Sequence, residues 1–275
     1  MDKYTVLMSV YIKEKPEYLS KSIDSMLAQT VKPDEFIIVE DGPLTNELYD
    51  VLDKYEKENN IIKRIKLEKN GGLGNALNVG LKQSRNELVA RMDSDDISFP
   101  ERCEKELKCF DDDNELVIVG TQIDEFIGTT DNIISSRQVP LNNDDIKKFA
   151  RRRSPFNHPT VMYKRSKVLE CGGYASSGRK EDLDLFLSMV FAGYKCKNIN
   201  ETLLFYRAGA DNLQRRKNWN NCKEYIEIIY KFYKEGYLGL SDLAYVIIGQ
   251  TALFLLPKNL TTLLNNKLLR NSVRK

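Results

Sequence analysis

Four short apolar segments alternate with amphipathic segments along the first 92 residues, and this alternation limits the possible folds more than any other feature. The apolar segments have the length and β-branched content of buried strands and lie at residues 5–10, 36–39, 61–67 and 88–92. Between them, apolar residues recur at helical spacing after Pro16 and over 71–82, and a polar helix is expected over roughly 45–59. This β-α-β-α-β-α-β order predicts an α/β fold with a mostly parallel sheet and helices on its faces.

Carboxylates stand where two of these strands end, and such sheets bind ligands outside the carboxyl ends of their strands. Asp41 follows the second strand. The fourth strand is followed by a cluster of three carboxylates, Asp93, Asp95 and Asp96. Because alternate residues of a strand share a side, Asp93 and Asp95 can be directed at one point, where Mg²⁺ or Mn²⁺ would relieve their repulsion. The alternative is a solvated acidic turn in which Asp96 caps a helix that begins at Pro100.

The charge balance and the cysteine content exclude several function classes. Forty-two Lys and Arg against forty Asp and Glu leave a net charge of +2, which is too balanced for a protein that coats nucleic acid. Five cysteines without a CxxC pair argue against a zinc site or a disulfide framework and indicate a reducing compartment. No apolar segment of the signal-peptide type follows Met1, and the single histidine disfavours a Ser/His/Asp hydrolase.

A series of short motifs occurs in a specific order along residues 5–216. The motifs are SVY at 9–11, QT at 29–30 with Pro33, FIIVEDG at 36–42, NGGL at 70–73, ALNVGL at 76–81, ARMDSDD at 90–96 with Pro100 and Arg102, NHPTV at 157–161, GGY at 172–174 and EDLDL at 181–185. In this order and spacing they resemble the inverting family 2 glycosyltransferases. The resemblance implies the GT-A fold, whose Rossmann-like central sheet agrees with the predicted strand order.

The resemblance also implies where a nucleotide-sugar donor binds. Ser9 and Tyr11 would line the base pocket, where the tyrosine ring can stack on the base. Asp41 would accept a hydrogen bond from a base N–H, such as that of uracil, so UDP is the expected nucleotide. Asn70 begins a loop whose glycines would let the backbone approach the donor.

The acidic motif and the later arginines complete the implied donor site. Asp95 corresponds to the metal ligand of the DxD pair, and Asp93 to a ligand of the metal or the ribose, with Mn²⁺ or Mg²⁺ as the cofactor. Arg91 is expected to reach the sugar or to pair with these carboxylates. Arg207 and Arg216 are expected to close over the diphosphate as a flexible cationic lid, with solvated surface charge as the alternative.

Catalysis with inversion requires a carboxylate that takes a proton from the acceptor hydroxyl. Asp182 corresponds to this base in the family, with Glu181 as the second candidate. Without the resemblance, two carboxylates at a helix start can simply complement the helix dipole. His158 borders the acceptor side in relatives, so it is either an acceptor-binding residue or a structural histidine.

The last part of the chain differs in composition, and we expect a catalytic domain over 1–217 and a C-terminal helical extension over 218–275. A helix over 219–235 should pack on the core. Residues 243–256 are almost wholly apolar but too few to span a bilayer, and from 243 to 275 the chain contains no Asp or Glu. A basic, leucine-containing stretch follows and predicts peripheral contact with an anionic membrane surface. The alternative is packing on the catalytic domain or in a homodimer.

The sequence therefore predicts a metal-dependent glycosyltransferase at the cytoplasmic face of a membrane, acting on a growing glycan or a lipid-linked acceptor in bacterial cell-surface polysaccharide synthesis. A sugar nucleotidyltransferase is an alternative, but residues 10–14 lack the glycine-rich, cationic loop that usually follows its first strand. A non-catalytic glycan-binding subunit is disfavoured by four carboxylates expected in one cleft, Asp41, Asp93, Asp95 and Asp182.

Overall fold

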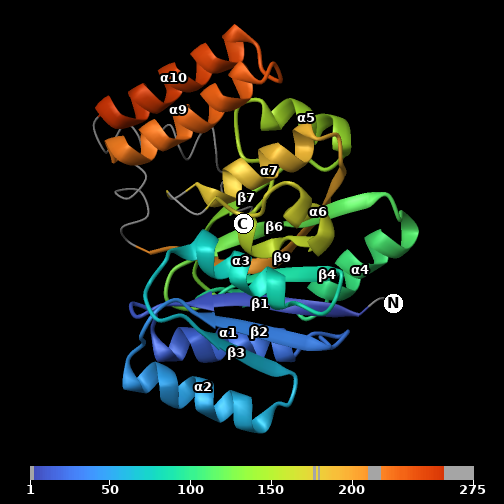
Figure 1. The fold of residues 1–275 in the computed structure, drawn as a ribbon, viewed down its shortest axis with the longest axis vertical. Coiled ribbons are helices and arrows are strands. Elements are labelled where there is room, and N and C mark those ends of the chain that lie inside the picture. Colours follow the sequence, from blue (N-terminus) through green and yellow to red (C-terminus); the bar gives the residue numbers. More distant parts are fainter. Residues whose placement is uncertain (1–2, 176–177, 179, 210–217, 257–275) are drawn as a thin grey trace.

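The computed structural model describes residues 3–175, 178, 180–209 and 218–256, and these residues form one sheet of nine strands (Figure 1). The four predicted strands lie in parallel in the order β3-β2-β1-β4. They are β1 (Tyr4–Val10), β2 (Glu35–Glu40), β3 (Ile62–Lys66) and β4 (Leu88–Asp93). The connecting helices are α1 (Pro16–Leu27), α2 (Asn46–Glu58) and α3 (Leu73–Gln83). The predicted alternation is confirmed.

Helices cover both faces of this parallel part, which explains why its strands have continuous apolar sequences. Val6 and Met8 of β1 pack with residues of α1 and α2 in one hydrophobic cluster. Leu7, which lies between them in the sequence, packs with α3 in a second cluster on the other face. The close approach of α3 depends on Gly80, because a Cβ atom there would lie 2.2 Å from Leu7 Cδ1.

The second half of the sheet is mixed, and its strands are not among those predicted from the sequence. They are β5 (Ile97–Ser98), β6 (Leu116–Phe126), β7 (Ile133–Arg137), β8 (Met162–Lys164) and β9 (Lys195–Arg207). The order continues from β4 through β8, β6 and β9 to β5, and β7 pairs with β6. β8 is antiparallel to β4 and β6, whereas the long strands β6 and β9 are parallel.

Four helices and one 3₁₀ turn accompany this second half. They are α4 (Arg102–Asp112), α5 (Asn143–Ala150), η1 (His158–Thr160), α6 (Arg165–Glu170) and α7 (Glu181–Phe191). The helix expected to start at the two adjacent carboxylates is thus α7. The helix expected to begin at Pro100 begins instead at Arg102, and its N-cap is Glu101.

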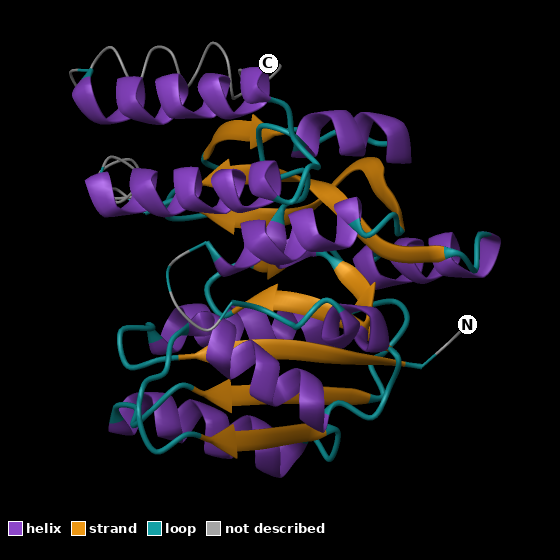
Figure 2. Ribbon diagram, turned by 45° about the horizontal axis from the view of Figure 1, so that its top comes forward, coloured by secondary structure: helices purple, strands orange, loops and turns teal. Residues whose placement is uncertain are grey.

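The last described helices, α9 (Trp219–Lys234) and α10 (Leu240–Leu255), lie side by side at the end of the molecule opposite β3 (Figures 1 and 2). As expected, α9 packs on the core, because Ile229 and Phe232 are buried in the cluster that contains α3 and α7 residues. Leu243 and Val246 extend this cluster to α10. No helix within the described ranges is long and apolar enough to cross a membrane.

Two predictions about the C-terminal part remain predictions. The domain boundary expected between 217 and 218 falls at the end of residues 210–217, which lie outside the described residues. Arg216, proposed as a donor-binding residue, is one of them. The basic stretch expected after α10 lies in residues 257–275, which are also outside them.

Two glycine-to-alanine substitutions should have opposite effects on stability. Gly80→Ala places a methyl group 2.2 Å from Leu7 Cδ1 and 3.1 Å from Val39 Cγ2 in a packed core, and should lower the free energy of unfolding by about 1–2 kcal/mol. Gly249→Ala in α10 meets no atom within 4 Å and should raise it by about 0.5–1 kcal/mol through helix propensity. Urea unfolding of both variants measures this; equal shifts would contradict the packing described for α3.

Candidate active site

A cleft with a volume of about 840 Å³ lies at the carboxyl ends of β1, β2 and β4. Seven of the residues proposed from the sequence line it: Ser9, Tyr11, Asp41, Asn70, Asp93, Asp95 and Arg207. The sheet register explains part of this meeting, because Ser9 at the end of β1 pairs with Asp93 at the end of β4. The side chain of Tyr11 is 41% exposed, so its ring is accessible to a ligand in the cleft.

Asp41 and the glycine-containing loop after β3 hold each other in place. The two carboxylate oxygens of Asp41 accept hydrogen bonds from the Gly71 and Gly72 backbone N–H groups at 2.7 and 3.1 Å. Asn70 Nδ2 donates to the Asp41 carbonyl oxygen at 3.0 Å. Gly72 has a φ angle of +86°, which a residue with a side chain rarely adopts. The motif residues Asp41, Asn70 and Gly72 thus form one rigid wall of the cleft.

The carboxylates beyond β4 are crowded, and their crowding changes their titration. Burial raises the pKa of Asp95 to about 7, the charges of Asp93 and Glu14 act in the same direction, and Arg207 opposes them. Glu14, which the sequence analysis does not single out, lines the same cleft and accepts a hydrogen bond from the Ser94 hydroxyl. A cation bound here would lower the repulsion among these groups.

The donor set fits a cation that is shared with a substrate. Within the described residues, no group of three or more His, Cys, Asp or Glu side chains could enclose a metal ion. Mg²⁺ is commonly held by one or two carboxylates and completed by water and substrate phosphates, and Asp93 and Asp95 provide such a pair.

Asp96 does not cap a helix, so that alternative is wrong. Its Oδ1 atom accepts a hydrogen bond from the Arg207 backbone N–H at 2.8 Å, which joins the acidic turn to the end of β9. The side chain is fully buried. Burial and the charges of Asp95 and Asp93 raise the pKa of Asp96 well above its usual range.

Arg207 is fixed in the fold and is not part of a flexible lid. It is the last residue of β9, and its guanidinium lies 3.8 Å from the ring centroid of Tyr18 and 4.5 Å from that of Phe126. Its Nε donates to the Asp95 carbonyl oxygen at 2.7 Å. The aromatic rings and this hydrogen bond therefore hold a cation beside the carboxylate pair.

Arg91 lies behind the cleft rather than in it. The residue is fully buried, and its Nη1 atom is 2.6 Å from Asp93 Oδ1. Burial alone would lower the pKa of Arg91, but the Asp93 carboxylate and the Tyr174 hydroxyl raise it above its usual range. Of the two roles expected for Arg91, the structure shows pairing with the acidic cluster.

His158 has the contacts of a structural histidine. Its Nε2 atom is 3.1 Å from the Tyr174 hydroxyl oxygen, and its ring packs edge-on against Phe186. Burial and the nearby Arg91 charge lower the pKa of His158 well below its usual range, so the ring is neutral at neutral pH. It is not among the residues that line the cleft.

Glu181 and Asp182 begin α7, outside the residues that line the cleft, and their environments differ. Glu181 is 8% exposed; burial raises its pKa to about 7, and the Asp182 charge adds to this effect. Asp182 is more accessible than Glu181.

The start of α7 is held by α3 through contacts that sequence reasoning missed. The side-chain amide of Asn78 pairs with both backbone polar groups of Tyr174, each at 2.8 Å. A Cβ atom on Gly74 would lie 2.1 Å from the Ala175 carbonyl oxygen and 3.2 Å from Glu181 Cβ. Asn78 belongs to the quoted ALNVGL motif, so its motif membership was the available signal, whereas Gly74 lies between two motifs and had none.

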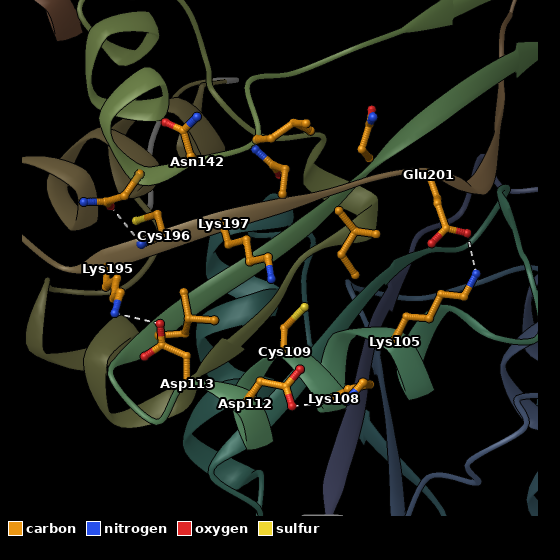
Figure 3. Close-up of a pocket in the computed structure, with 16 residues that line it drawn as sticks. Lys105, Lys108, Cys109, Asp112, Asp113, Asn142, Lys195, Cys196, Lys197 and Glu201 are labelled. Carbon is orange, nitrogen blue, oxygen red and sulfur yellow. Dashed lines mark hydrogen bonds and ion pairs between the residues drawn. The ribbon is translucent and has the colours of Figure 1, made fainter.

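A second cavity, of about 550 Å³, contains none of the residues predicted for the site (Figure 3). It lies between α4 and β9, and its charged side chains are largely paired with each other. The ion pairs are Lys105–Glu201, Lys108–Asp112 and Lys195–Asp113. We assign it no role in the chemistry.

The mixed sheet, with paired carboxylates at its strand ends and an aromatic residue beside them, has the arrangement expected of a GT-A glycosyltransferase. The Glycosyl transferase family 2 model matches residues 5–173. The chain belongs to this family, and the resemblance seen in the sequence is confirmed.

Related proteins and a solved structure agree with this assignment. The amylovoran biosynthesis glycosyltransferase AmsE of Erwinia amylovora is 37% identical over 82% of this chain and 84% of its own length. The Escherichia coli UDP-Gal:alpha-D-GlcNAc-diphosphoundecaprenol beta-1,3-galactosyltransferase is 36% identical over 98% of this chain and 97% of its own length. The mannosyltransferase PcManGT from Pyrobaculum calidifontis, solved with GDP-Man and Mn²⁺, has a TM-score of 0.62 at 14% identity over 97% of this chain and 79% of that chain. This last likeness confirms the fold.

The burial of Glu181 should make stability depend on pH. Its pKa is raised from 4.5 to about 7 in the folded protein, so between these values the folded state binds more protons than the unfolded state. The free energy of unfolding should therefore fall as the pH rises from 5 to 7, by about 1–3 kcal/mol more than in Glu181→Gln. Glu227→Gln, at an exposed position of α9, is the matched control and should keep the parent's slope. Identical slopes for the parent and Glu181→Gln would contradict the buried environment.

Proposed function

We propose that this glycosyltransferase moves a sugar, with inversion, from a UDP-sugar to a lipid-linked or growing glycan in cell-surface polysaccharide synthesis. The observation that carries the proposal is the meeting of Tyr11, Asp41 and the Asp93–Asp95 pair in one cleft. The names of two relatives support it, since one acts with UDP-Gal on a diphosphoundecaprenol-linked sugar and the other in amylovoran biosynthesis.

The rigid wall and the carboxylate pair bind different parts of the donor. Tyr11 stacks on the base, and Asp41 accepts a hydrogen bond from the base through lone pairs not used by the glycine N–H groups. Asp95, together with Asp93, would hold Mn²⁺ or Mg²⁺, which supplies charge neutralisation for the leaving diphosphate. Arg207, fixed beside Asp95, adds a second positive charge at the same place.

The transfer step needs a base on the acceptor side of the cleft. The acceptor hydroxyl oxygen forms a bond to the anomeric carbon while the bond from that carbon to the diphosphate oxygen breaks. The proton of the hydroxyl passes to Asp182, and the nucleoside diphosphate leaves. Attack opposite to the leaving group inverts the anomeric configuration. The accessible position of Asp182 at the start of α7 supports this role over Glu181, whose burial favours the neutral form.

An enzyme that uses a lipid-linked acceptor must act at a membrane surface. The five cysteines form no disulfide, which fits a reducing compartment and the cytoplasmic face of the membrane. We therefore infer a peripheral enzyme that reaches its acceptor from that side.

Donor turnover should depend on both a divalent cation and Asp95. We expect a screen of nucleotide sugars to show UDP release with Mn²⁺ or Mg²⁺, loss of release in excess EDTA, and a fall of ~10²-fold or more in Asp95→Ala. Asp112→Ala, at an exposed position on α4, is the control and should match the parent. Full transfer in EDTA or by Asp95→Ala contradicts the metal site, and release of pyrophosphate identifies a nucleotidyltransferase instead.

Substitution of the base should separate binding from chemistry. Asp182→Asn keeps the size of the side chain but cannot take up a proton at neutral pH, so transfer should fall by ~10²-fold or more while calorimetry shows nearly unchanged donor binding. Asp184→Asn changes the same helix two residues on, where the carboxylate pairs with Lys231 at 2.8 Å, and should retain activity. Loss of donor binding in Asp182→Asn would make it a structural residue, and Glu181 would be tested next.

A further inference from the structure

The two C-terminal helices concentrate the exposed apolar side chains of the molecule. Nine of the thirteen large hydrophobic side chains exposed in the described residues belong to α9, α10 or the turn between them: Trp219, Tyr230, Tyr237, Leu240, Tyr245, Ile247, Ile248, Phe254 and Leu255. Because large exposed apolar side chains in soluble proteins are normally scattered singly, this concentration indicates an interaction surface.

Along α10 these side chains follow a helical spacing. The α10 outer face consists of the exposed residues Leu240, Ala244, Ile247, Ile248 and Leu255. Steps of three, four and seven residues keep them on one side of the helix. The 16 residues of α10 give this face a length of about 24 Å.

The α10 outer face carries no charge, because the single charged residue of α10 is turned inward. Asp242 is 3% exposed and accepts hydrogen bonds from Arg151 Nε at 2.8 Å and from Arg152 Nε at 3.0 Å. These two arginines lower the pKa of Asp242 despite its burial, so the carboxylate stays ionised and paired. The acid that would repel an anionic surface is thus neutralised inside the protein.

A group of cations borders this uncharged face. The α5 basic segment, residues 147–153, has the sequence KKFARRR and contains five cations, two of which, Arg151 and Arg152, pair with Asp242. The Arg152 guanidinium lies 4.6 Å from the ring centroid of Tyr245 in α10, which brings the segment against the helix. Lys147, Lys148 and Arg151 line a cavity of about 320 Å³ together with the apolar side chains of Phe191 and Tyr237. Figure 1 shows α5 beside the end of the helix pair where α9 turns into α10.

We propose that the α10 outer face and the α5 basic segment form one docking surface for a bilayer that contains anionic phospholipid. Apolar side chains enter the acyl boundary while the neighbouring cations meet the headgroups. Exposed Trp219 and Tyr237, near opposite ends of the helix pair, suit the interfacial region of a bilayer. The sequence after α10 contains five further basic residues and no acid. A second copy of the chain would instead bring an identical cationic segment to this surface.

A charge placed on the α10 outer face should abolish docking. Ile248 is 69% exposed, so Ile248→Glu should fold normally while its partitioning onto vesicles with 30% phosphatidylserine falls by ~10-fold or more. The matched control is Ile134→Glu in β7, where the isoleucine is 45% exposed, and it should sediment with vesicles as the parent does. Thermal unfolding of both variants verifies that they fold.

A charge reversal in the α5 basic segment should affect anionic vesicles selectively. The Lys148 side chain is 78% exposed, and Lys148→Glu should weaken binding by about tenfold at low salt and much less at high salt. Lys108→Glu, at a side chain that is 69% exposed on α4, changes the net charge equally and should have no such effect.

The role of this surface rests on the proposed function, and activity measurements on the same variants test the two independently. UDP release with a water-soluble acceptor should stay at the parent level in Ile248→Glu and Lys148→Glu. Absence of transfer in a parent that binds vesicles contradicts the proposed function and leaves the docking surface standing. Equal binding of the parent and Ile248→Glu, or no preference for anionic vesicles, overturns the docking surface. A third outcome would also overturn the docking surface. In it, the parent does not bind vesicles and forms a dimer by light scattering, and Ile248→Glu dissociates this dimer.

Discussion

A fully buried guanidinium behind the cleft is the interaction on which the arrangement of the site depends. Arg91 is enclosed by the fold, and Asp93 at 2.6 Å is its ionic partner. Removing that partner would leave an unpaired buried charge, which is strongly destabilising. The end of β4 is also fixed from the other side, because fully buried Arg102 donates to the carbonyl oxygens of Arg91 at 3.0 Å and Pro159 at 2.7 Å. The first carboxylate of the acidic motif is therefore oriented before any ligand arrives.

The same buried region connects the donor side of the protein with the helix that bears the proposed base. The Tyr174 hydroxyl lies 3.1 Å from His158 Nε2 and 3.2 Å from the Tyr163 hydroxyl, and the Asn78 amide holds the Tyr174 backbone. Burial and the nearby charge of Arg91 lower the pKa of His158, so the histidine stays neutral beside the arginine. These buried contacts thus link α3 and β8 with η1, whose His158 packs against Phe186 of α7.

The parallel half of the fold could be predicted because local sequence carries its signal: strands covered on both faces read as short apolar runs, and their ends are marked by acids. The mixed half carries a weaker signal. β5 has two residues and β8 three, too few for a periodicity, and their pairing partners are distant in sequence. Asp96 and Arg207 are 111 residues apart, so neither the fixed position of the arginine nor the role of the aspartate could be read locally. His158 was ambiguous for the same reason, because its Tyr174 and Phe186 contacts come from other elements.

Although the net charge of the chain is nearly zero, its acidic and basic residues gather at two different places, as the two proposed surfaces require. Acids gather at the cleft, where the proposed donor diphosphate would be bound through a cation, whereas the α5 basic segment lies beside α10 and would meet anionic headgroups directly. Screening confines each field to about 8 Å at physiological salt, so the two need not cancel. α9 connects α10 with α7: Lys231 pairs with Asp184 of α7 at 2.8 Å, Phe232 packs on Phe191, and the helix lies along α10. A bilayer that holds α10 would thereby fix the height of α7, and with it Asp182, above the membrane that carries the acceptor.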